Sequence, residues 1–274
     1  MSLLEAIVLG IVQGLTEFLP ISSTGHLRVV PAFLGWEDPG AAFTAVTQMG
    51  TMAAVLAYFR EDLMRIARAW LGSLNDRAKR RELDARIGWY IVLGTVPIGI
   101  FGVLFKDQIE TSARDLYVIG VALIVLGLIL AAAEKVGDRE RTIDQIKTRD
   151  GFWIGLAQAL ALIPGVSRSG ATITAGLFLG LDRAAAARFS FLLSVPAVVL
   201  SGLFELSSIL EGEEGEHIGA VHLVVATTLA FVFGYASIAF LLRFLASHTT
   251  LVFVVYRVGL GAVVLMLAGA GVIE

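Results

Sequence analysis

Long apolar stretches separated by short polar segments make up most of the chain. Six of them are long enough to cross the roughly 30 Å hydrocarbon core of a bilayer as single helices, which takes about 20 residues each. They cover residues 41–60, 87–105, 116–134, 184–207, 219–242 and 250–273. The pattern therefore predicts six transmembrane helices.

Two further apolar regions, residues 3–35 and 151–181, are interrupted near their middle by FLPISSTGH and LIPGVSRSGAT. Proline and glycine break the helical hydrogen-bond ladder there, and each remaining half is too short to cross alone. Non-helical backbone at membrane depth is tolerated only where it is buried in protein or lines a wet cavity. We therefore predict two re-entrant helix–turn–helix hairpins, called hairpin 1 (3–35) and hairpin 2 (151–181).

The two hairpins resemble each other in sequence, which indicates an internal repeat. Residues that match at a constant spacing are Gly10 and Gly155, Gln13 and Gln158, Leu15 and Leu160, Ser22 and Ser167, Thr24 and Ser169, Gly25 and Gly170, and the Phe-Leu-Gly triplets at 33–35 and 178–180. Repeat 1 covers residues 1–136 and repeat 2 residues 150–274, with a cytoplasmic linker at 137–149. Each repeat holds one hairpin and three spans, and an odd number of spans inverts the second repeat. The predicted fold is an all-α polytopic membrane protein with an inverted-topology repeat, an architecture that builds binding sites near the membrane midplane.

The distribution of basic residues predicts the orientation in the membrane. Segments 60–86 and 135–149 are rich in arginine and lysine, whereas residues 211–216 read EGEEGE. Because cytoplasmic loops carry the excess of positive charge, the two basic segments are expected in the cytoplasm and residues 208–218 outside. Hairpin 1 then enters from outside and hairpin 2 from the cytoplasm, so that their broken tips meet near the midplane. We predict a multi-pass protein of the plasma membrane with a site that faces outside.

Composition agrees with a membrane protein and excludes several other classes. The 274 residues are 57% hydrophobic and only 16% charged, against about 25% charged in soluble domains. A net charge of −3 argues against nucleic acid as a partner, and the absence of cysteine excludes disulfides and thiolate metal sites. The N-terminus has neither the basic region nor the cleavage site of a signal peptide.

Hairpin 2 places Arg168 in apolar surroundings, where an arginine is costly unless it is paired or wet and therefore indicates a functional site. A guanidinium binds phosphate bidentately, and the helix that opens at Gly165–Arg168 attracts anions at its N-terminus. Ser167, Ser169 and Thr172 add hydroxyl donors. These residues predict a phosphate cradle. The alternative is a structural arginine paired with a carboxylate, with the serines capping a broken helix.

Hairpin 1 carries groups that complement a phosphate cradle. They are Gln13, Glu17, Ser22, Ser23, Thr24 and His26. Gln13 and Glu17 share a helix face. Ser23 and His26 lie three residues apart and can pair as a hydroxyl nucleophile and an imidazole base. The alternative is a helix N-cap formed by the Ser/Thr cluster, with a structural histidine.

Three other polar residues lie within apolar stretches. Arg28 either reaches a phosphate or extends outward. Arg257, about two turns inside the last span, is expected to extend its charged end to the cytoplasmic interface. Gln48 is expected to hydrogen-bond across helices.

QGLTEFLPISSTGH (13–26) and PGVSRSGAT (164–172) resemble the two signature motifs of the undecaprenyl-diphosphatase family of the bacitracin-resistance type, and the similarity covers essentially the whole chain. Members dephosphorylate undecaprenyl diphosphate, releasing the monophosphate carrier and inorganic phosphate. The resemblance implies that Gln13 and Glu17 form the family's [E/Q]-x-x-x-E pair, and it implies roles for Ser23, His26, Ser167, Arg168 and Thr172. Arg28 departs from the apolar residue expected at that position.

These observations together assign catalysis to Glu17, Ser23, His26 and Arg168. Substrate binding is assigned to Gln13, Ser22, Thr24, Gly165, Ser167, Ser169 and Thr172. A divalent cation, Mg²⁺ or Ca²⁺, would depend on Glu17 and the substrate phosphates, because Gln13 takes the place of a second carboxylate. The sequence leaves open whether Ser23 attacks or positions a water, with His26 taking the proton and Glu17 orienting His26 or holding the cation.

The expected partners are a polyprenyl diphosphate lipid and the membrane, and we also predict a homodimer. Two other functions stay open at this point. A transporter or flippase of an anionic polyprenyl lipid would use the inverted repeat and Arg168 but would not need Ser23, His26 and Glu17. A structural scaffold would not need the polar tips.

Overall fold

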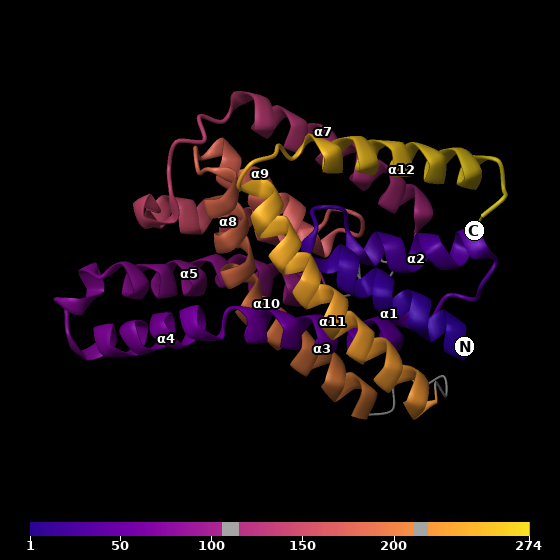
Figure 1. Cartoon of the computed structure of the whole chain (residues 1–274), viewed down its shortest axis with the longest axis horizontal. Coiled ribbons are helices and arrows are strands. Elements are labelled where there is room, and N and C mark those ends of the chain that lie inside the picture. The colour runs from indigo at the N-terminus through magenta and orange to yellow at the C-terminus, as the bar shows by residue number, and fades with distance from the viewer. Residues whose placement is uncertain (106–114, 211–218, 274) are drawn as a thin grey trace.

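The computed structural model describes residues 1–105, 115–210 and 219–273, apart from the side chains of Ala41 and residues 201–210. The described residues form helices and contain no β-strand beyond one isolated bridge between Arg141 and Leu181. Both termini lie at the same end of the long axis (Figure 1). The predicted all-α membrane fold is confirmed, while the acidic segment 211–216 lies outside the described residues.

The two predicted hairpins are helix–turn–helix units interrupted where the sequence indicated. Hairpin 1 is formed by α1 (Leu3–Phe18) and α2 (Ser23–Leu34). Hairpin 2 is formed by α8 (Thr148–Ala159), a short 3-10 helix η3 (Leu160–Leu162) and α9 (Arg168–Phe178). That each hairpin enters and leaves the membrane on one side stays a prediction.

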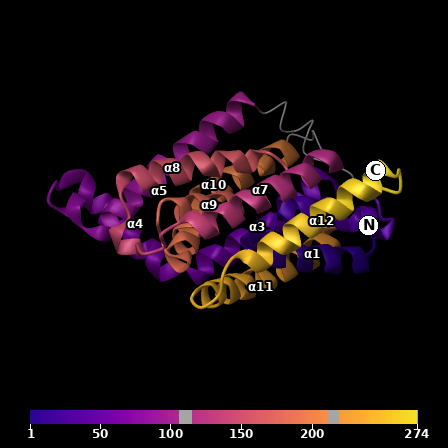
Figure 2. The same ribbon diagram turned by 90° about the horizontal axis from the view of Figure 1, so that it is seen from above.

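Five of the six predicted spans are helices long and apolar enough to cross a membrane. They are α5 (Leu83–Leu104), α7 (Leu116–Val136), α10 (Arg183–Leu210), α11 (Ala220–Leu245) and α12 (Leu251–Gly269). The sixth predicted span corresponds to α3 (Gly40–Tyr58), which is followed directly by α4 (Arg60–Asn75) at a bend of 74°. Figures 1 and 2 show α7 and α12 running side by side, whereas α11 crosses obliquely to α12 in Figure 1.

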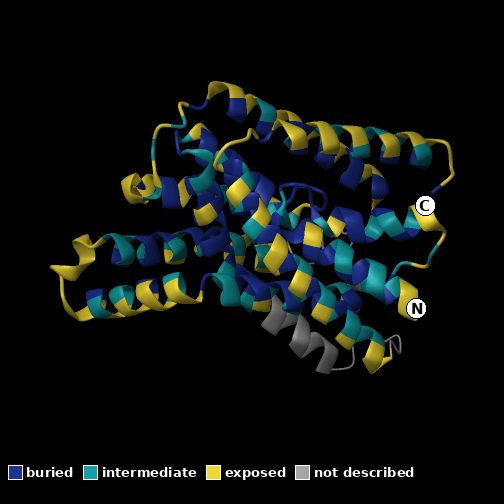
Figure 3. Ribbon diagram, in the orientation of Figure 1, coloured by how far each residue is buried: buried dark blue, intermediate teal, exposed yellow. Residues whose placement is uncertain are grey.

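The basic segment 60–86, expected as a cytoplasmic connection between two spans, is largely helical, because α4 and the short 3-10 helix η1 (Lys79–Arg81) occupy most of it. The outer face of α4 is exposed (Figure 3). Its inner face packs on α5, where the rings of Trp70 and Trp89 lie 5.7 Å apart. Asp62 accepts hydrogen bonds from Arg65 and Arg188, at 2.9 and 2.6 Å. The helix is therefore stabilised by ion pairs and one apolar stripe, which a search for apolar runs does not detect.

The predicted linker 137–149 is partly ordered as well. It contains the 3-10 helix η2 (Ile143–Gln145), and α8 begins at its end. Arg141 exchanges two backbone hydrogen bonds with the chain at Gly180 and Asp182, and its guanidinium contacts the buried Asp150 at 2.5 Å. These contacts tie the linker to both ends of hairpin 2.

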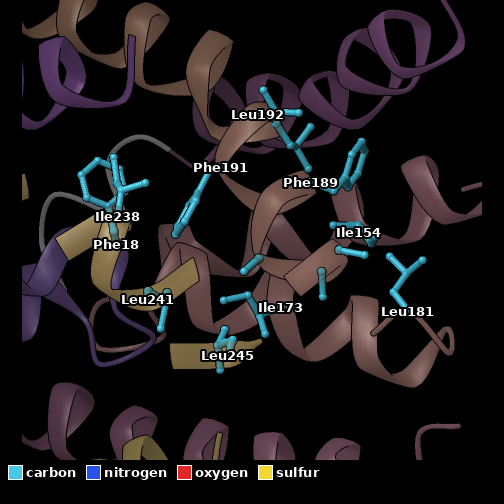
Figure 4. Close-up of a cluster of buried hydrophobic side chains, with 14 of the residues drawn as sticks. Phe18, Ile154, Ile173, Leu181, Phe189, Phe191, Leu192, Ile238, Leu241 and Leu245 are labelled. Atoms are coloured by element: carbon cyan, nitrogen blue, oxygen red, sulfur yellow. The ribbon is translucent and has the colours of Figure 1, made fainter. Parts of the chain in front are cut away.

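The largest buried cluster lies where the hairpins meet α10 and α11. Figure 4 shows Phe18 of α1, Ile173 of α9, Phe191 of α10 and Ile238 of α11 within this cluster. The rings of Phe18 and Phe191 meet edge to face, 5.5 Å apart. This apolar packing fixes the two hairpin turns relative to each other.

Glycines that match between the repeats make equivalent close helix contacts. A Cβ added at Gly10 of α1 would lie 2.5 Å from the carbonyl oxygen of Ala226 in α11, and one at Gly155 of α8 would lie 2.2 Å from the Cα of Gly94 in α5. Small residues at membrane helix interfaces let backbones approach in this way. Each hairpin thus packs its first helix closely against another long helix, α1 against α11 and α8 against α5.

Gly155→Ala is expected to destabilise the protein by about 1–3 kcal/mol, because the new methyl group would overlap the backbone of α5, which cannot move aside by rotating a side chain. Gly99→Ala in α5, where an added Cβ meets no atom within 4 Å, is the matched control and should be neutral. The measurement is the thermal unfolding midpoint in detergent. Equal midpoints for the two variants would contradict the close packing of α8 on α5.

Candidate active site

The turns of the two hairpins enclose a polar cavity of about 160 Å³. Residues of both turns line it, together with side chains from α3, α5 and α10. They are Gln13, Glu17, Ser22, Ser23, Thr24, Thr44, Gln48, Ile98, Ala161, Leu162, Ile163, Gly165, Ser167, Arg168, Ala197 and Val198. The first residues of α2 and α9 both lie in this lining, so two helix N-termini converge on one cavity. Such termini attract negative charge.

Both helices at the cavity begin with a serine N-cap in an unusual backbone conformation. Ser22 has φ 76° and Ser167 has φ 71°, in the left-handed region that a non-glycine residue seldom adopts. Each side chain accepts a hydrogen bond from the backbone N–H three residues on, at Gly25 and Gly170. Residues held in this region cost about 1–3 kcal/mol each and cluster at functional sites. The matching strain in the two repeats therefore marks these turns as a site.

Glu17 is the central acceptor of the site. Its Oε2 accepts a hydrogen bond from Ser23 Oγ at 2.6 Å and one from Gln13 Nε2 at 3.1 Å. Gln13 and Glu17 are buried, whereas Ser23 is less so. The i, i+4 spacing that the sequence indicated holds Gln13 against Glu17, and the turn brings Ser23 back to the same carboxylate.

Arg168 joins the two hairpins. Its Nη2 donates to Glu17 Oε1 at 2.5 Å, and its Nη1 is 3.5 Å from the carbonyl oxygen of Ser194. The structure thus contains the carboxylate pairing that was the alternative interpretation of Arg168, and it places that pair in the cavity lining. A guanidinium has five N–H donors, so donors remain beyond these two bonds.

Two of the predicted binding residues lie outside the cavity lining. Ser169 donates to the carbonyl oxygen of Leu19 in hairpin 1 at 3.0 Å. Thr172 is fully buried, donates to the carbonyl oxygen of Arg168 at 2.8 Å and shares a 2.5 Å hydrogen bond with Ser190 of α10. In this arrangement Ser169 and Thr172 hold the turn and the first helical turn of α9 in place.

His26 does not contact Ser23 in this structure. Its Nδ1 is 2.7 Å from the carbonyl oxygen of Ser22, and its Nε2 is 2.7 Å from the hydroxyl of Tyr256 in α12. The two rings lie nearly parallel with centroids 5.6 Å apart. The structure therefore places His26 behind the strained turn, and the Ser23 hydroxyl donates to Glu17 instead.

Among the residues that sequence reasoning left outside the site, Thr44 and Gln48 line the cavity from α3. They lie four residues apart on one face of an apolar helix, which is a signal that could have found them. Arg28 pairs with Asp38 at 3.4 Å.

The expectation that Arg257 extends to the membrane interface is wrong. Its side chain is 0% exposed and lies behind the two turns, where backbone carbonyl oxygens bind it.

A divalent cation fits the site only if a phosphate supplies ligands with it. Gln13 Oε1 is buried and has no hydrogen-bond partner, while Nε2 of the same amide donates to Glu17. Within the described part of the chain, no group of three His, Cys, Asp or Glu side chains could hold an ion. The amide oxygen and the carboxylate would be the protein ligands, and Mg²⁺ and Ca²⁺ accept further oxygens from phosphate and water.

Fold and site together define an all-helical polytopic membrane protein in which two interrupted helices enclose an arginine, a carboxylate and a serine. The chain belongs to the family of the bacitracin resistance protein BacA, whose family model matches residues 6–263. Relatives named undecaprenyl-diphosphatase confirm this. The one from a Nocardioides species is 55% identical over 98% of both chains. The one from Myxococcus xanthus is 56% identical over 99% of this chain and 91% of its own length.

Proposed function

We propose that this chain hydrolyses undecaprenyl diphosphate to undecaprenyl phosphate and inorganic phosphate, which recycles the lipid carrier for cell-wall synthesis and gives resistance to bacitracin. Membership of the BacA family and the names of relatives about 55% identical over nearly the whole chain support the reaction. One structural observation carries the assignment of the site. Ser23, Glu17 and Arg168 form a contact chain across the two turns, at the point where two helix N-termini converge.

The contacts support Ser23 as nucleophile and Glu17 as its base. The Ser23 proton passes to Glu17 Oε2, Ser23 Oγ bonds to the terminal phosphorus, and the bond from that phosphorus to the bridging oxygen breaks. Undecaprenyl phosphate leaves with the bridging oxygen. Water then attacks the phosphoserine, Glu17 returns the proton to Ser23 Oγ, and inorganic phosphate is released.

Arg168 and the backbone of the turns stabilise the charge on the transferring phosphoryl group. The N–H groups in the first turn of a helix need partners outside that helix, and those of α2 and α9 begin at the cavity. The terminal phosphate would take hydrogen bonds from them and from Arg168, in competition with Glu17. In this scheme His26 supports the Ser22 carbonyl and so the position of Ser23. A divalent cation held by Glu17 and Gln13 would supply additional charge neutralisation for the phosphates.

We place the polyprenyl tail in an apolar groove that adjoins the cavity. The groove has a volume of about 970 Å³ and is formed by α5, α7, α8 and α9, with side chains such as Phe101, Trp153, Ala157 and Phe178. Leu162 and Ile163 line both the groove and the polar cavity. A lipid with its head at Arg168 would therefore continue past these two residues into apolar surroundings.

The location and assembly of the protein extend this proposal. We place it in the plasma membrane with the cavity open to the outside, because the positive-inside pattern puts the entry of hairpin 1 there. A homodimer stays a prediction from the sequence.

Ser23→Ala and Glu17→Gln should each lower the rate of phosphate release by about 10²–10⁴, the usual contribution of general base catalysis. The double variant should be little slower than the slower single one, because residues acting as a unit are not additive. The measurement is phosphate release from undecaprenyl diphosphate by purified protein in detergent. Losses that multiply in the double variant would contradict the pair.

The same assay separates the other mechanisms. If water were the nucleophile, Ser23→Ala would keep part of its activity while Glu17→Gln lost nearly all of it. A transporter of the lipid would release no phosphate even as the wild type.

Arg168→Lys should slow phosphate release by about 10²–10³, the loss typical of removing one donor from a charge-stabilising site, because an ammonium does not reproduce the guanidinium fork. Arg188→Lys is the matched control, since Arg188 also pairs with a carboxylate, Asp62, but at the exposed surface. A turnover near that of the wild type for Arg168→Lys would refute its role as a phosphate clamp.

Ala157→Trp should raise KM for undecaprenyl diphosphate roughly tenfold, since preventing burial of about two CH₂ groups costs about 1.5 kcal/mol. KM for a short-chain prenyl diphosphate, which does not fill the groove, should stay unchanged. The control is Ala236→Trp, at an exposed position of α11 away from the groove. An equal change of KM for both substrates would argue against the groove as the tail site.

A further inference from the structure

Arg257 is the most completely buried large charged side chain described, and the mechanism above does not use it. Its guanidinium donates to five backbone carbonyl oxygens: Leu123 at 3.3 Å, Pro20 at 3.2 Å, Ala122 at 3.4 Å, Gly165 at 3.0 Å and Val166 at 2.9 Å. Pro20 lies in the turn of hairpin 1, and Gly165 and Val166 lie in the turn of hairpin 2. One side chain from α12 therefore holds the backbone of both broken turns.

The carbonyl contacts fix the direction of the neighbouring N–H groups. A trans peptide group is planar, with its C=O and N–H pointing to opposite sides. Holding the Val166 carbonyl toward Arg257 therefore turns the N–H of Ser167 away from Arg257, and Ser167 and Gly165 line the cavity. Arg257 thus sets the orientation of the peptide groups that lead into α9, where the phosphate would bind.

The position also has an electrostatic consequence. Carbonyl oxygens carry only partial negative charge, so they offset the charge of Arg257 incompletely, and burial reduces screening by water. The guanidinium of Arg257 contacts the carbonyl oxygen of Gly165, a residue of the cavity lining, so that one peptide group separates the charge from the cavity. It adds to the positive field of the two helix N-termini where a diphosphate would bind.

The packing around Arg257 restricts which residue can stand at position 170. A Cβ added at Gly170, in the first turn of α9, would lie 2.6 Å from Arg257 Nη1 and 3.1 Å from the Cβ of Ser167. Position 170 therefore accommodates the guanidinium because it is a glycine. The next residue along α12 toward the N-terminus, Tyr256, contacts His26, so α12 supports the hairpin 1 turn at two consecutive positions.

We propose that Arg257 is a positioning residue for phosphoryl transfer: it docks the turns of the two hairpins on each other and orients the backbone donors of the cavity, without touching the substrate. The proposal rests on the hydrolase function given above. It differs from a role in folding alone, because it requires the rate of the chemical step to depend on the guanidinium fork even in folded protein.

Arg257→Lys keeps the charge and removes the fork that reaches several carbonyls at once. We expect kcat and kcat/KM for undecaprenyl diphosphate to fall together by about 10², the effect of a displacement of about 1 Å at a reacting centre, and KM to change little. Arg243→Lys, at an exposed arginine in the last turn of α11, is the control. Gel filtration and thermal unfolding in detergent show whether each variant is folded. A folded Arg257→Lys protein with the kcat of the wild type, or with only a raised KM, would overturn the proposal.

Gly170→Ala tests the proposal also where Arg257→Lys does not fold, because it keeps Arg257 while the added Cβ would lie 2.6 Å from Arg257 Nη1. We expect kcat to fall with KM little changed, while Gly259→Ala in α12, where an added Cβ meets no atom within 4 Å, retains the kcat of the wild type. Wild-type kcat in Gly170→Ala would contradict the proposal.

Where Arg257→Lys does fold, Gly170→Ala should cost less in that background, since lysine has no Nη1 for the methyl group to meet. Equal costs in both backgrounds would show that Gly170→Ala acts through Ser167 and would count against Arg257. If the wild type itself released no phosphate, the hydrolase function would fail instead, which keeps the two failures distinct.

Discussion

A backbone that leaves the helix inside a membrane must satisfy its polar groups within the protein, because lipid offers no hydrogen bonds. This constraint governs the whole structure. The two turns satisfy it largely through each other and through α12: Ser169 donates to Leu19 across the hairpins, and Arg257 donates to Pro20 and Val166. Neither turn can shift without unpairing groups of the other. The position of the cavity between the turns therefore follows from the two interrupted helices, and its polar lining comes from the turn residues and helix N-termini that converge there.

The membrane helices and their interruptions could be predicted from sequence, because the length of an apolar run and the position of proline and glycine are local properties that the bilayer selects directly. Helix α4 could not be found in that way. Its stability comes from partners distant in the chain, such as the ion pairs from Asp62 to Arg188 and from Arg65 to Asp84. A charged amphipathic segment resembles a loop until its partners are known.

For the site, the sequence identified the residue types and which of them share a helix face, but not what covers each face. Gln13, Glu17, Ser23 and Arg168 do gather at the cavity. Thr172 lies on a face covered by Ser190 of α10, and His26 lies on one covered by Tyr256 of α12.

The burial of Arg257 could not be predicted from sequence for another reason. Its partners are backbone carbonyl groups, which every residue has, so that no residue type marks them. The left-handed conformation of Ser22 and Ser167 was likewise unpredictable, since a serine N-cap usually has extended backbone.

The differences between the two turns explain why a symmetric arrangement can bind an asymmetric lipid. In the sequence repeat that matches Ser22 with Ser167, Ser23 matches Arg168 and Glu17 matches Leu162. Identical turns would place two like charges in one small cavity, where they would repel each other strongly. Divergence instead gives hairpin 1 the hydroxyl of Ser23 and the carboxylate of Glu17, and gives hairpin 2 the guanidinium of Arg168, which contacts that carboxylate across the cavity at 2.5 Å. The same divergence removes a carboxylate at Leu162, which lines both the cavity and the apolar groove. The cavity is consequently charged toward hairpin 1 and apolar toward the groove, which matches the head-to-tail polarity of a prenyl diphosphate.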